Sequence, residues 1–185
     1  MKGPVVDESG SFTVSASVEL DSKALEEKPL GYTGQIAGQR TDNESAWALW
    51  VTKFANGMYQ WKFTRTGFDS DGQVESAEVM AEELAETDTW VEVTGVYDAQ
   101  ESSGSADATY GQLHLYVGTS HQPSGPNSAF TAAQPGSDEL AIGRGAKGGA
   151  TGNYLPGSLQ SLKIWTGAMT SDQVSAEVQA ASGAG

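Results

Sequence analysis

The carboxylates and the two histidines are the side chains of this sequence most able to do chemistry, and no catalytic motif contains them. Glu86-Thr87-Asp88 begins the strand pattern E-x-D-x-x-E, which would place a nucleophile and an acid on one face for glycoside hydrolysis, but Val91 stands at the final position. His114 and His121 are accompanied by no G-x-S-x-G nucleophile elbow, so a Ser-His-Asp triad has no anchor. A zinc site would need ligands that this cysteine-free chain does not supply. The sequence therefore predicts a protein that binds something and is not an enzyme.

Two carboxylates in one loop are candidate metal ligands. Asp69 and Asp71 are two residues apart in Asp69-Ser70-Asp71-Gly72, a spacing that lets both face one calcium ion, which prefers oxygen ligands. The alternative is an Asx turn that closes a β-hairpin, and the glycine does not fall at the sixth position as it does in an EF-hand. Ca²⁺ is thus the one cofactor that the sequence suggests.

A glycine-rich run resembles a nucleotide-binding fingerprint only in its spacing. Residues 143–148 match G-x-G-x-x-G, which works when the last glycine opens a helix whose amino end meets a pyrophosphate. Gly149, Gly152 and Pro156 follow, so no helix begins there. We expect a loop and no dinucleotide.

The elements that position these residues are strands, because the dominant hydrophobic period is two. Alternating or strand-like runs cover residues 12–20, 47–52, 59–64, 74–80, 89–98 and 111–118, and shorter strands are expected over 128–132, 139–143 and 158–166. Asn56-Gly57 is a strong hairpin signal. Only Ser171–Ala181 has a helical pattern, with Thr170 and Gln173 as a capping box. Short strands separated by loops rich in Gly, Ser and Pro predict an all-β sandwich or barrel.

The outward positions of these strands form a candidate binding face. Strand alternation turns outward, among others, Trp50, Lys62, Glu92, His114 and Tyr116. If their strands lie side by side in one sheet, Trp50 and Tyr116 would stack on a sugar ring, and the three polar side chains would hydrogen-bond its hydroxyls. The alternative is that Trp50 packs under a long loop or against a neighbouring domain.

The net charge and the short apolar runs of the sequence restrict the classes of partner that the protein can bind. The 185 residues include 24 acidic and 10 basic ones, and the formal net charge of −14 disfavours nucleic acid and anionic membrane surfaces. No apolar run approaches the roughly 18 residues that span a bilayer, so membrane insertion is not expected. We expect one domain over residues 1–185, monomeric in isolation, with a core from about 11 to 178. The linker-like ends indicate a module of a longer protein, whose targeting signal would lie elsewhere.

Five runs in order make the chain similar to the LamG-like domains, which are laminin G or concanavalin A-like jelly rolls of bacterial surface and secreted proteins. The runs are residues 11–16, 89–98, 111–117, 140–143 and 156–159. The resemblance implies two antiparallel sheets with jelly-roll topology, here followed by the short C-terminal helix. It also implies carbohydrate or protein binding, adhesion or a spacer role, and many members of the family hold one calcium ion at the rim.

The resemblance thus predicts an extracellular or cell-surface module whose partner is a glycan or another surface protein. A non-catalytic carbohydrate-binding or adhesion module is the first expectation. A structural or protein-interaction domain without a sugar site is the alternative, and a glycanase is the least expected. The sequence departs from the family at Ser17, at Gly118-Thr119 and at Gln160-Ser161, where many relatives have an aromatic, an Asn-Gly or Asp-Gly turn and an Asp-Glu pair. The last departure bears on calcium, because a ligand is expected near that position.

Overall fold

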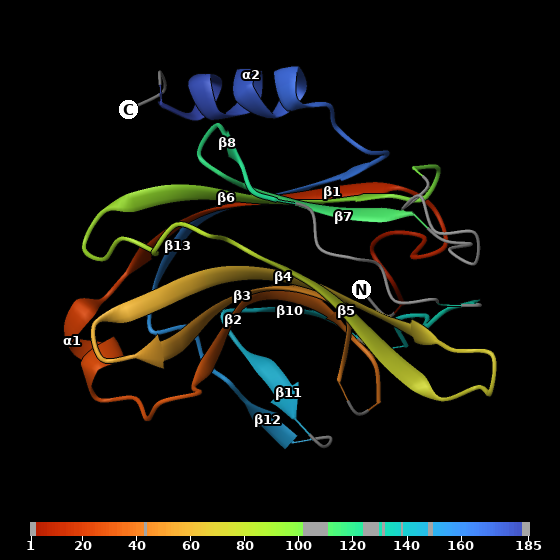
Figure 1. Cartoon of the computed structure of the whole chain (residues 1–185), viewed down its shortest axis with the longest axis horizontal. Coiled ribbons are helices and arrows are strands. Elements are labelled where there is room, and N and C mark those ends of the chain that lie inside the picture. The colour runs from red at the N-terminus through yellow and green to blue at the C-terminus, as the bar shows by residue number, and fades with distance from the viewer. Residues whose placement is uncertain are drawn as a thin grey trace.

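The computed structural model describes residues 3–42, 44–101, 111–123, 130, 132–137, 139–147 and 150–182. Two antiparallel β-sheets pack face to face in this part of the chain, and a helix close to the C-terminus lies outside them (Figure 1). The arrangement confirms the predicted fold class, an all-β jelly-roll sandwich with one short C-terminal helix.

The first sheet has five strands in the order β13-β1-β6-β7-β8, and each neighbouring pair is antiparallel. Its strands are β1 (Phe12–Leu20), β6 (Trp90–Asp98), β7 (Gln112–Val117), β8 (Ser120–His121) and β13 (Gly157–Thr166). Phe12 lies opposite both Thr166 and Tyr97, so the first long strand of the chain is held between the last strand and a central one.

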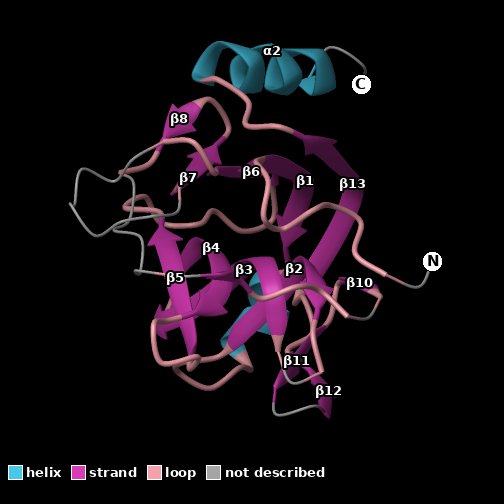
Figure 2. Ribbon diagram, turned by 90° about the vertical axis from the view of Figure 1, so that its right-hand side faces the viewer, coloured by secondary structure: helices cyan, strands magenta, loops and turns pink. Residues whose placement is uncertain are grey.

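The second sheet has six strands, of which five follow the order β10-β2-β3-β4-β5 while the sixth, β9, pairs with β4. Its strands are β2 (Thr33–Arg40), β3 (Ser45–Ala55), β4 (Met58–Phe68), β5 (Val74–Met80), β9 (Ala132–Ala133) and β10 (Leu140–Ile142). A separate hairpin of β11 (Gly145–Lys147) and β12 (Ala150–Gly152) stands beside β2, on the side away from the first sheet (Figure 2).

The inward residues of both sheets make one aromatic core. The Phe12 ring lies 5.5 Å from the Trp47 ring and 6.2 Å from the Phe63 ring, which joins the two sheets across the sandwich. Gly95 is required at this contact, because a Cβ there would lie 2.7 Å from the Phe63 ring. Full burial of each large aromatic side chain contributes on the order of 2–3 kcal/mol before the entropy of ordering is subtracted.

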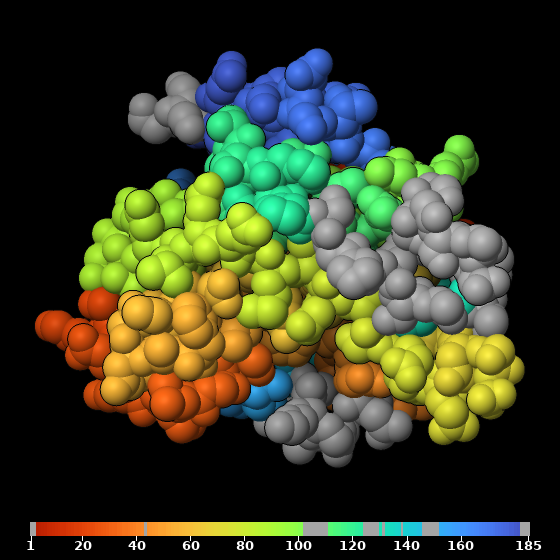
Figure 3. Space-filling view, viewed as in Figure 1, coloured from red at the N-terminus to blue at the C-terminus, as the bar shows by residue number. Residues whose placement is uncertain are grey.

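Two helices flank the strands. Helix α1 (Ser22–Glu26) begins with Asp21 as its N-cap, and the buried Lys53 ammonium donates to three carbonyl oxygens at and after its end, those of Leu25, Glu26 and Lys28, at 2.9, 3.0 and 2.9 Å. Helix α2 (Ser171–Ser182) starts at the predicted capping box, in which Thr170 N–H donates to Gln173 Oε1 at 2.9 Å. Helix α2 is the outermost layer above the five-stranded sheet (Figures 1 and 3).

The long alternating runs were predicted correctly as strands, and the Asn56-Gly57 hairpin joins β3 to β4. Strands β2, β8, β11 and β12 and helix α1 were not predicted, and the glycine-rich run 143–148, which contains β11, was expected to be a loop. The predicted strand over 128–132 falls largely outside the described residues, and β9 begins at Ala132. Neither helix in the described part of the chain is long and apolar enough to cross a membrane.

Candidate functional site

The five predicted binding residues lie on two opposite surfaces of the sandwich. Trp50 and Lys62 belong to β3 and β4 of the six-stranded sheet, whereas Glu92, His114 and Tyr116 belong to β6 and β7 of the five-stranded sheet. The prediction that these strands lie side by side in one sheet is therefore wrong. The alternation of residues indicates which side chains point away from the core. In a sandwich, however, each of the two sheets has its own outer face, so alternation does not show which face a residue lies on.

Trp50 is a half-buried aromatic on the outer face of the six-stranded sheet. It lies opposite Lys62 on β4 and Gln35 on β2. Its indole N–H donates to Oγ1 of Thr64 at 2.8 Å, which draws the ring along the sheet toward that side chain. The rotamer of Trp50 is thus held before any ligand arrives.

Polar side chains adjoin Trp50 on the same face. Lys62 Nζ lies 3.2 Å from Glu78 Oε2, and the Lys62 side chain keeps 18% of its surface exposed while that of Glu78 keeps 50%. Gln60, two residues before Lys62 on the same strand, donates from its amide to the Ala81 carbonyl at 3.0 Å. A cation, a carboxylate and an amide therefore lie on the same face of the sheet as the indole.

Apolar side chains continue this face toward the β3–β4 hairpin. Phe54 and Met58 are each 43% exposed at the end of β3 and the start of β4. Trp50 and Phe54 are four residues apart, about 13 Å along a strand. Both described helices lie elsewhere, with α1 at the edge of the sandwich and α2 on the opposite sheet (Figure 1). We call the surface formed by Trp50, Phe54, Met58, Gln60, Lys62 and Glu78 the open face.

The outer face of the five-stranded sheet is covered by α2. Val96 and Tyr116 are 1% and 5% exposed, and they pack with Val174 in a small second core to which Val178 adds. The Tyr116 hydroxyl lies 3.0 Å from Oγ of Ser171, the first residue of α2. Tyr116 therefore docks the helix and has no ring face available for stacking on a sugar. We call this surface the covered face.

Glu92 is engaged in a hydroxyl network on the covered face. Ser15 Oγ donates to Glu92 Oε1 at 2.7 Å and lies 2.6 Å from Thr94 Oγ1, so the Thr94 hydroxyl donates to Ser15. Both hydroxyl residues are buried. The carboxylate thus satisfies buried hydroxyl groups between β1 and β6, which is a structural role.

His114 lies at the rim of the covered face with a second histidine and a carboxylate. Its Nε2 is 2.8 Å from Glu101 Oε2, and its Nδ1 is 3.2 Å from His121 Nε2. The His121 ring stacks on Tyr116 with centroids 4.7 Å apart. Partial burial, and then the neighbouring His114, lower the pKa of His121 below its ordinary value, and Glu101 opposes that shift. These side chains line a cavity of about 310 Å³ that reaches the start of α2.

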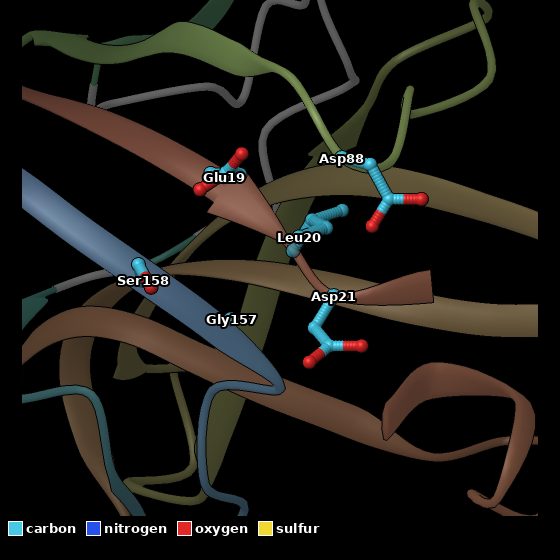
Figure 4. A pocket seen from close by; sticks show the side chains of 6 residues that line it. All are labelled: Glu19, Leu20, Asp21, Asp88, Gly157 and Ser158. Atoms are coloured by element: carbon cyan, nitrogen blue, oxygen red, sulfur yellow. The ribbon is translucent and has the colours of Figure 1, made fainter. Parts of the chain in front are cut away.

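A second cavity, of about 270 Å³, lies at the rim where β1 ends (Figure 4). Glu19, Asp21 and Asp88 line it, but in Figure 4 their carboxylates do not converge on one point. Asp21 Oδ1 accepts from the Ala24 N–H at 2.9 Å, and Asp88 Oδ1 accepts from the Ser22 N–H at 3.1 Å. Hydrogen bonding from the side chain and then from the backbone of Ser22 lowers the pKa of Asp88. Both aspartates therefore fix the start of α1.

The predicted calcium ligands lie in the turn between β4 and β5. Asp69 Oδ1 accepts from the backbone N–H groups of Asp71 and Gln73, both at 2.8 Å, which is the Asx turn considered as the alternative. That oxygen is thus committed to amide donors, whereas calcium takes six to eight oxygen ligands. Within the described residues, no three His, Cys, Asp or Glu side chains converge as metal ligands. The turn by itself does not fit a calcium site, and calcium binding by the chain stays a prediction.

The fold and the sequence place the chain in a known family. The chain belongs to the concanavalin A-like lectin/glucanases superfamily, because the laminin G-type family model of that description matches residues 2–175. The resemblance seen in the sequence is thereby confirmed. No curated protein matches the chain by sequence.

Three solved structures share the fold at low sequence identity. The SAP-like pentraxin from Limulus polyphemus is 15% identical with a TM-score of 0.58, and the match covers 89% of this chain and 68% of the pentraxin. A putative carbohydrate binding protein from Bacteroides ovatus is 18% identical with a TM-score of 0.59, over 94% of this chain and 42% of that protein. Domain 4 of AbnA, an extracellular GH43 arabinanase from Geobacillus stearothermophilus solved with arabinotriose, is 18% identical with a TM-score of 0.55, over 97% of this chain and 71% of that domain.

These likenesses establish the fold alone. The chain spans less than half of the Bacteroides protein that it matches.

Proposed function

We propose that the chain is a non-catalytic glycan-binding module of an exported protein, and that the glycan lies on the open face. The observation that carries the proposal is the position of Trp50. It is an indole held by Thr64 at 2.8 Å, on the sheet surface that α2 does not cover. The family and the carbohydrate-binding proteins among its structural neighbours support the same class of ligand.

Trp50 supplies the apolar half of sugar recognition. The C–H face of a pyranose or furanose ring packs on an aromatic ring, while its hydroxyls need hydrogen-bonding partners at the edge of the contact. Because the indole N–H is already bonded within the protein, stacking leaves no buried donor without a partner. The fixed rotamer also reduces the entropy lost on binding.

The neighbours of Trp50 supply the polar half. Lys62 donates, Glu78 accepts, and Gln60 can do both, which suits the mixed donor and acceptor character of sugar hydroxyls. Lys62 is retained from the predicted set. Glu92, His114 and Tyr116 are not part of the proposed site, because they serve the covered face.

The length of the open face favours an oligosaccharide over a single sugar. The separation of about 13 Å between Trp50 and Phe54 exceeds one sugar ring. A chain of two or three residues would reach from the indole to the exposed Phe54 and Met58. We therefore expect affinity to rise with glycan length up to about three residues and then to level off.

A glycan array followed by calorimetry with the best ligand tests the proposal. Trp50→Ala is expected to weaken binding at least tenfold, equivalent to about 1.4 kcal/mol. Trp90→Ala is the matched control, because Trp90 is also a partly exposed tryptophan, 45% exposed, but belongs to β6 of the other sheet. Equal affinities for Trp50→Ala and the unaltered protein would remove the open face from consideration.

A protein-interaction role is the second candidate, and one observation favours it. Leu30 is 61% exposed next to Gly31, whose N–H donates to the backbone carbonyl of Lys53 at 2.8 Å, so Leu30 adds to the exposed Phe54 and Met58 near the hairpin. Exposed apolar groups of this kind are typical of protein contacts. A blank glycan array, together with specific binding of a surface protein that Phe54→Ala weakens, would favour this role instead.

A further inference from the structure

We propose that His114 and His121 bind a divalent transition-metal ion of the zinc type at the rim of the covered face, and that Glu101 positions His114 for it. The site is separate from the open face and does not depend on glycan binding. The sequence alone excluded a zinc site because too few ligands are present, but it did not show that the only two histidines of the chain meet.

The β7–β8 hairpin brings the two rings together. Tyr116 lies opposite His121 in the register, so both histidines point to the same side of the sheet as Tyr116, and Gly118 makes the turn with a φ of 56°. His114 Nδ1 and His121 Nε2 are 3.2 Å apart. Two nitrogens bound to one Zn²⁺ at about 2.0–2.1 Å with tetrahedral angles are roughly 3.3–3.4 Å apart. The pair therefore has almost the separation that a bound ion requires.

Glu101 fixes the tautomer of His114 that a metal needs. A carboxylate accepts and does not donate, so the His114 nitrogen at 2.8 Å from Glu101, Nε2, carries a proton. In the neutral ring the lone pair is then on Nδ1, which faces His121. A carboxylate bonded to the outer nitrogen of a ligating histidine is the common second layer of protein zinc sites.

The surroundings hold His121 in place and leave room for further ligands. The His121 ring stacks on Tyr116, which is buried and bonded to Ser171 of α2. The adjoining cavity of about 310 Å³, lined also by Asp98, has space for the waters that would complete the coordination. No three such side chains converge among the described residues, so this part of the chain offers the two histidines as ligands.

Imidazole nitrogens select the class of metal. They suit Zn²⁺, Cu²⁺ and Ni²⁺, whereas Mg²⁺ and Ca²⁺ prefer oxygen ligands. The formal net charge of −14 attracts any divalent cation without specificity. A test must therefore separate binding to the histidine pair from binding to the acidic surface.

Calorimetric titration of the metal-free protein with Zn²⁺ makes this separation, with Mg²⁺ as the comparison ion. We expect saturable binding of one equivalent of Zn²⁺ that Mg²⁺ does not displace. His114→Ala and His121→Asn should each weaken it more than tenfold, and Glu101→Gln about tenfold, because second-layer changes typically cost 10–100-fold in metal affinity. Trp50→Ala should leave it unchanged.

Unfolding curves for each variant show whether it folds. His121 is exposed, so His121→Asn is expected to fold even if His114→Ala does not. Zn²⁺ affinity that survives in folded His121→Asn would overturn the proposal, as would the absence of saturable binding to the unaltered protein. A loss in the histidine variants with no change in Glu101→Gln would retain the ligands and overturn the role of Glu101.

Discussion

The outer faces of the two sheets carry the same kinds of residue in different surroundings. Tyr116 on the covered face and Trp50 on the open face are both aromatic residues at outward positions of long strands. Helix α2 buries Tyr116 to 5% exposure and bonds its hydroxyl, whereas Trp50 is half-buried and bonds Thr64 of its own sheet. The outward side of a strand can therefore form a binding surface or a second core, depending on which segment of the chain packs over it.

The largest expected effect is on stability at the covered face. Tyr116→Ala removes a buried ring and its contact with Ser171, and we expect the free energy of unfolding to fall by about 3 kcal/mol. Trp50→Ala should cost about 1 kcal/mol, because the indole is only half-buried. Urea denaturation of the two variants measures both values. Equal losses would mean that the two faces do not differ as described.

A smaller loss is expected when the helix contact alone is weakened. Val174 lies on the buried side of α2 and is 1% exposed, and Val174→Ala should lower the free energy of unfolding by about 1.5 kcal/mol. Gln179→Ala, an exposed position of the same helix, is the control and should change stability by less than about 0.5 kcal/mol. If both variants behave alike in urea denaturation, α2 does not cover the sheet.

A buried carboxyl that belongs to neither outer face should make the stability of the fold depend on pH. Burial raises the pKa of Glu8 above its ordinary value of 4.5, and Arg65 partly opposes the shift. The folded state therefore binds the proton of Glu8 more tightly than the unfolded state does. The contribution of Glu8 to the free energy of unfolding is present below pH 4.5 and is lost as the pH rises through the raised pKa. Glu8→Gln should flatten this fall in stability, measured as Tm against pH. It keeps the bond from Arg65, which goes to the Glu8 backbone carbonyl at 2.6 Å.

A steeper pH dependence in Glu8→Gln than in the unaltered protein would contradict this assignment.

The smallest effect is expected at the exposed ion pair of the open face. Glu78→Gln removes the negative charge that pairs with Lys62 and should change the free energy of unfolding by about 0.5 kcal/mol or less, because exposed ion pairs are weak and screened by salt. The same variant should weaken glycan binding if Glu78 accepts from a sugar hydroxyl. A large loss of stability, seen in the same urea experiment, would show that the pair holds the sheet together.

The long strands could be predicted because one side of each is buried, which produces a clear alternation in residues such as Phe12, Val14 and Ala16. Strand β2 escaped prediction because nearly all of its residues are buried on both sides, including Gln35 and Gly38, so no alternation remains. Helix α1 has only five residues, too few for a helical period to be visible.

The candidate site could be predicted only in part. Alternation identified Trp50 and Lys62 as outward residues, but sheet membership depends on pairing between distant segments, such as β1 with β13. Thr64, Gln60 and Glu78 were missed because their roles come from neighbours across strands. The meeting of His114 with Glu101 and His121 was missed for the same reason. A register drawn through the Gly118 turn would have brought the two histidines onto one face.

Glycan affinity measured by calorimetry for the Trp50→Ala and Trp90→Ala variants shows which of the two sheets binds the ligand. The open-face account predicts that Trp50→Ala loses at least tenfold in affinity while Trp90→Ala binds as the unaltered protein does. Loss of affinity in Trp90→Ala with full affinity in Trp50→Ala would place the ligand on the other sheet and contradict the account.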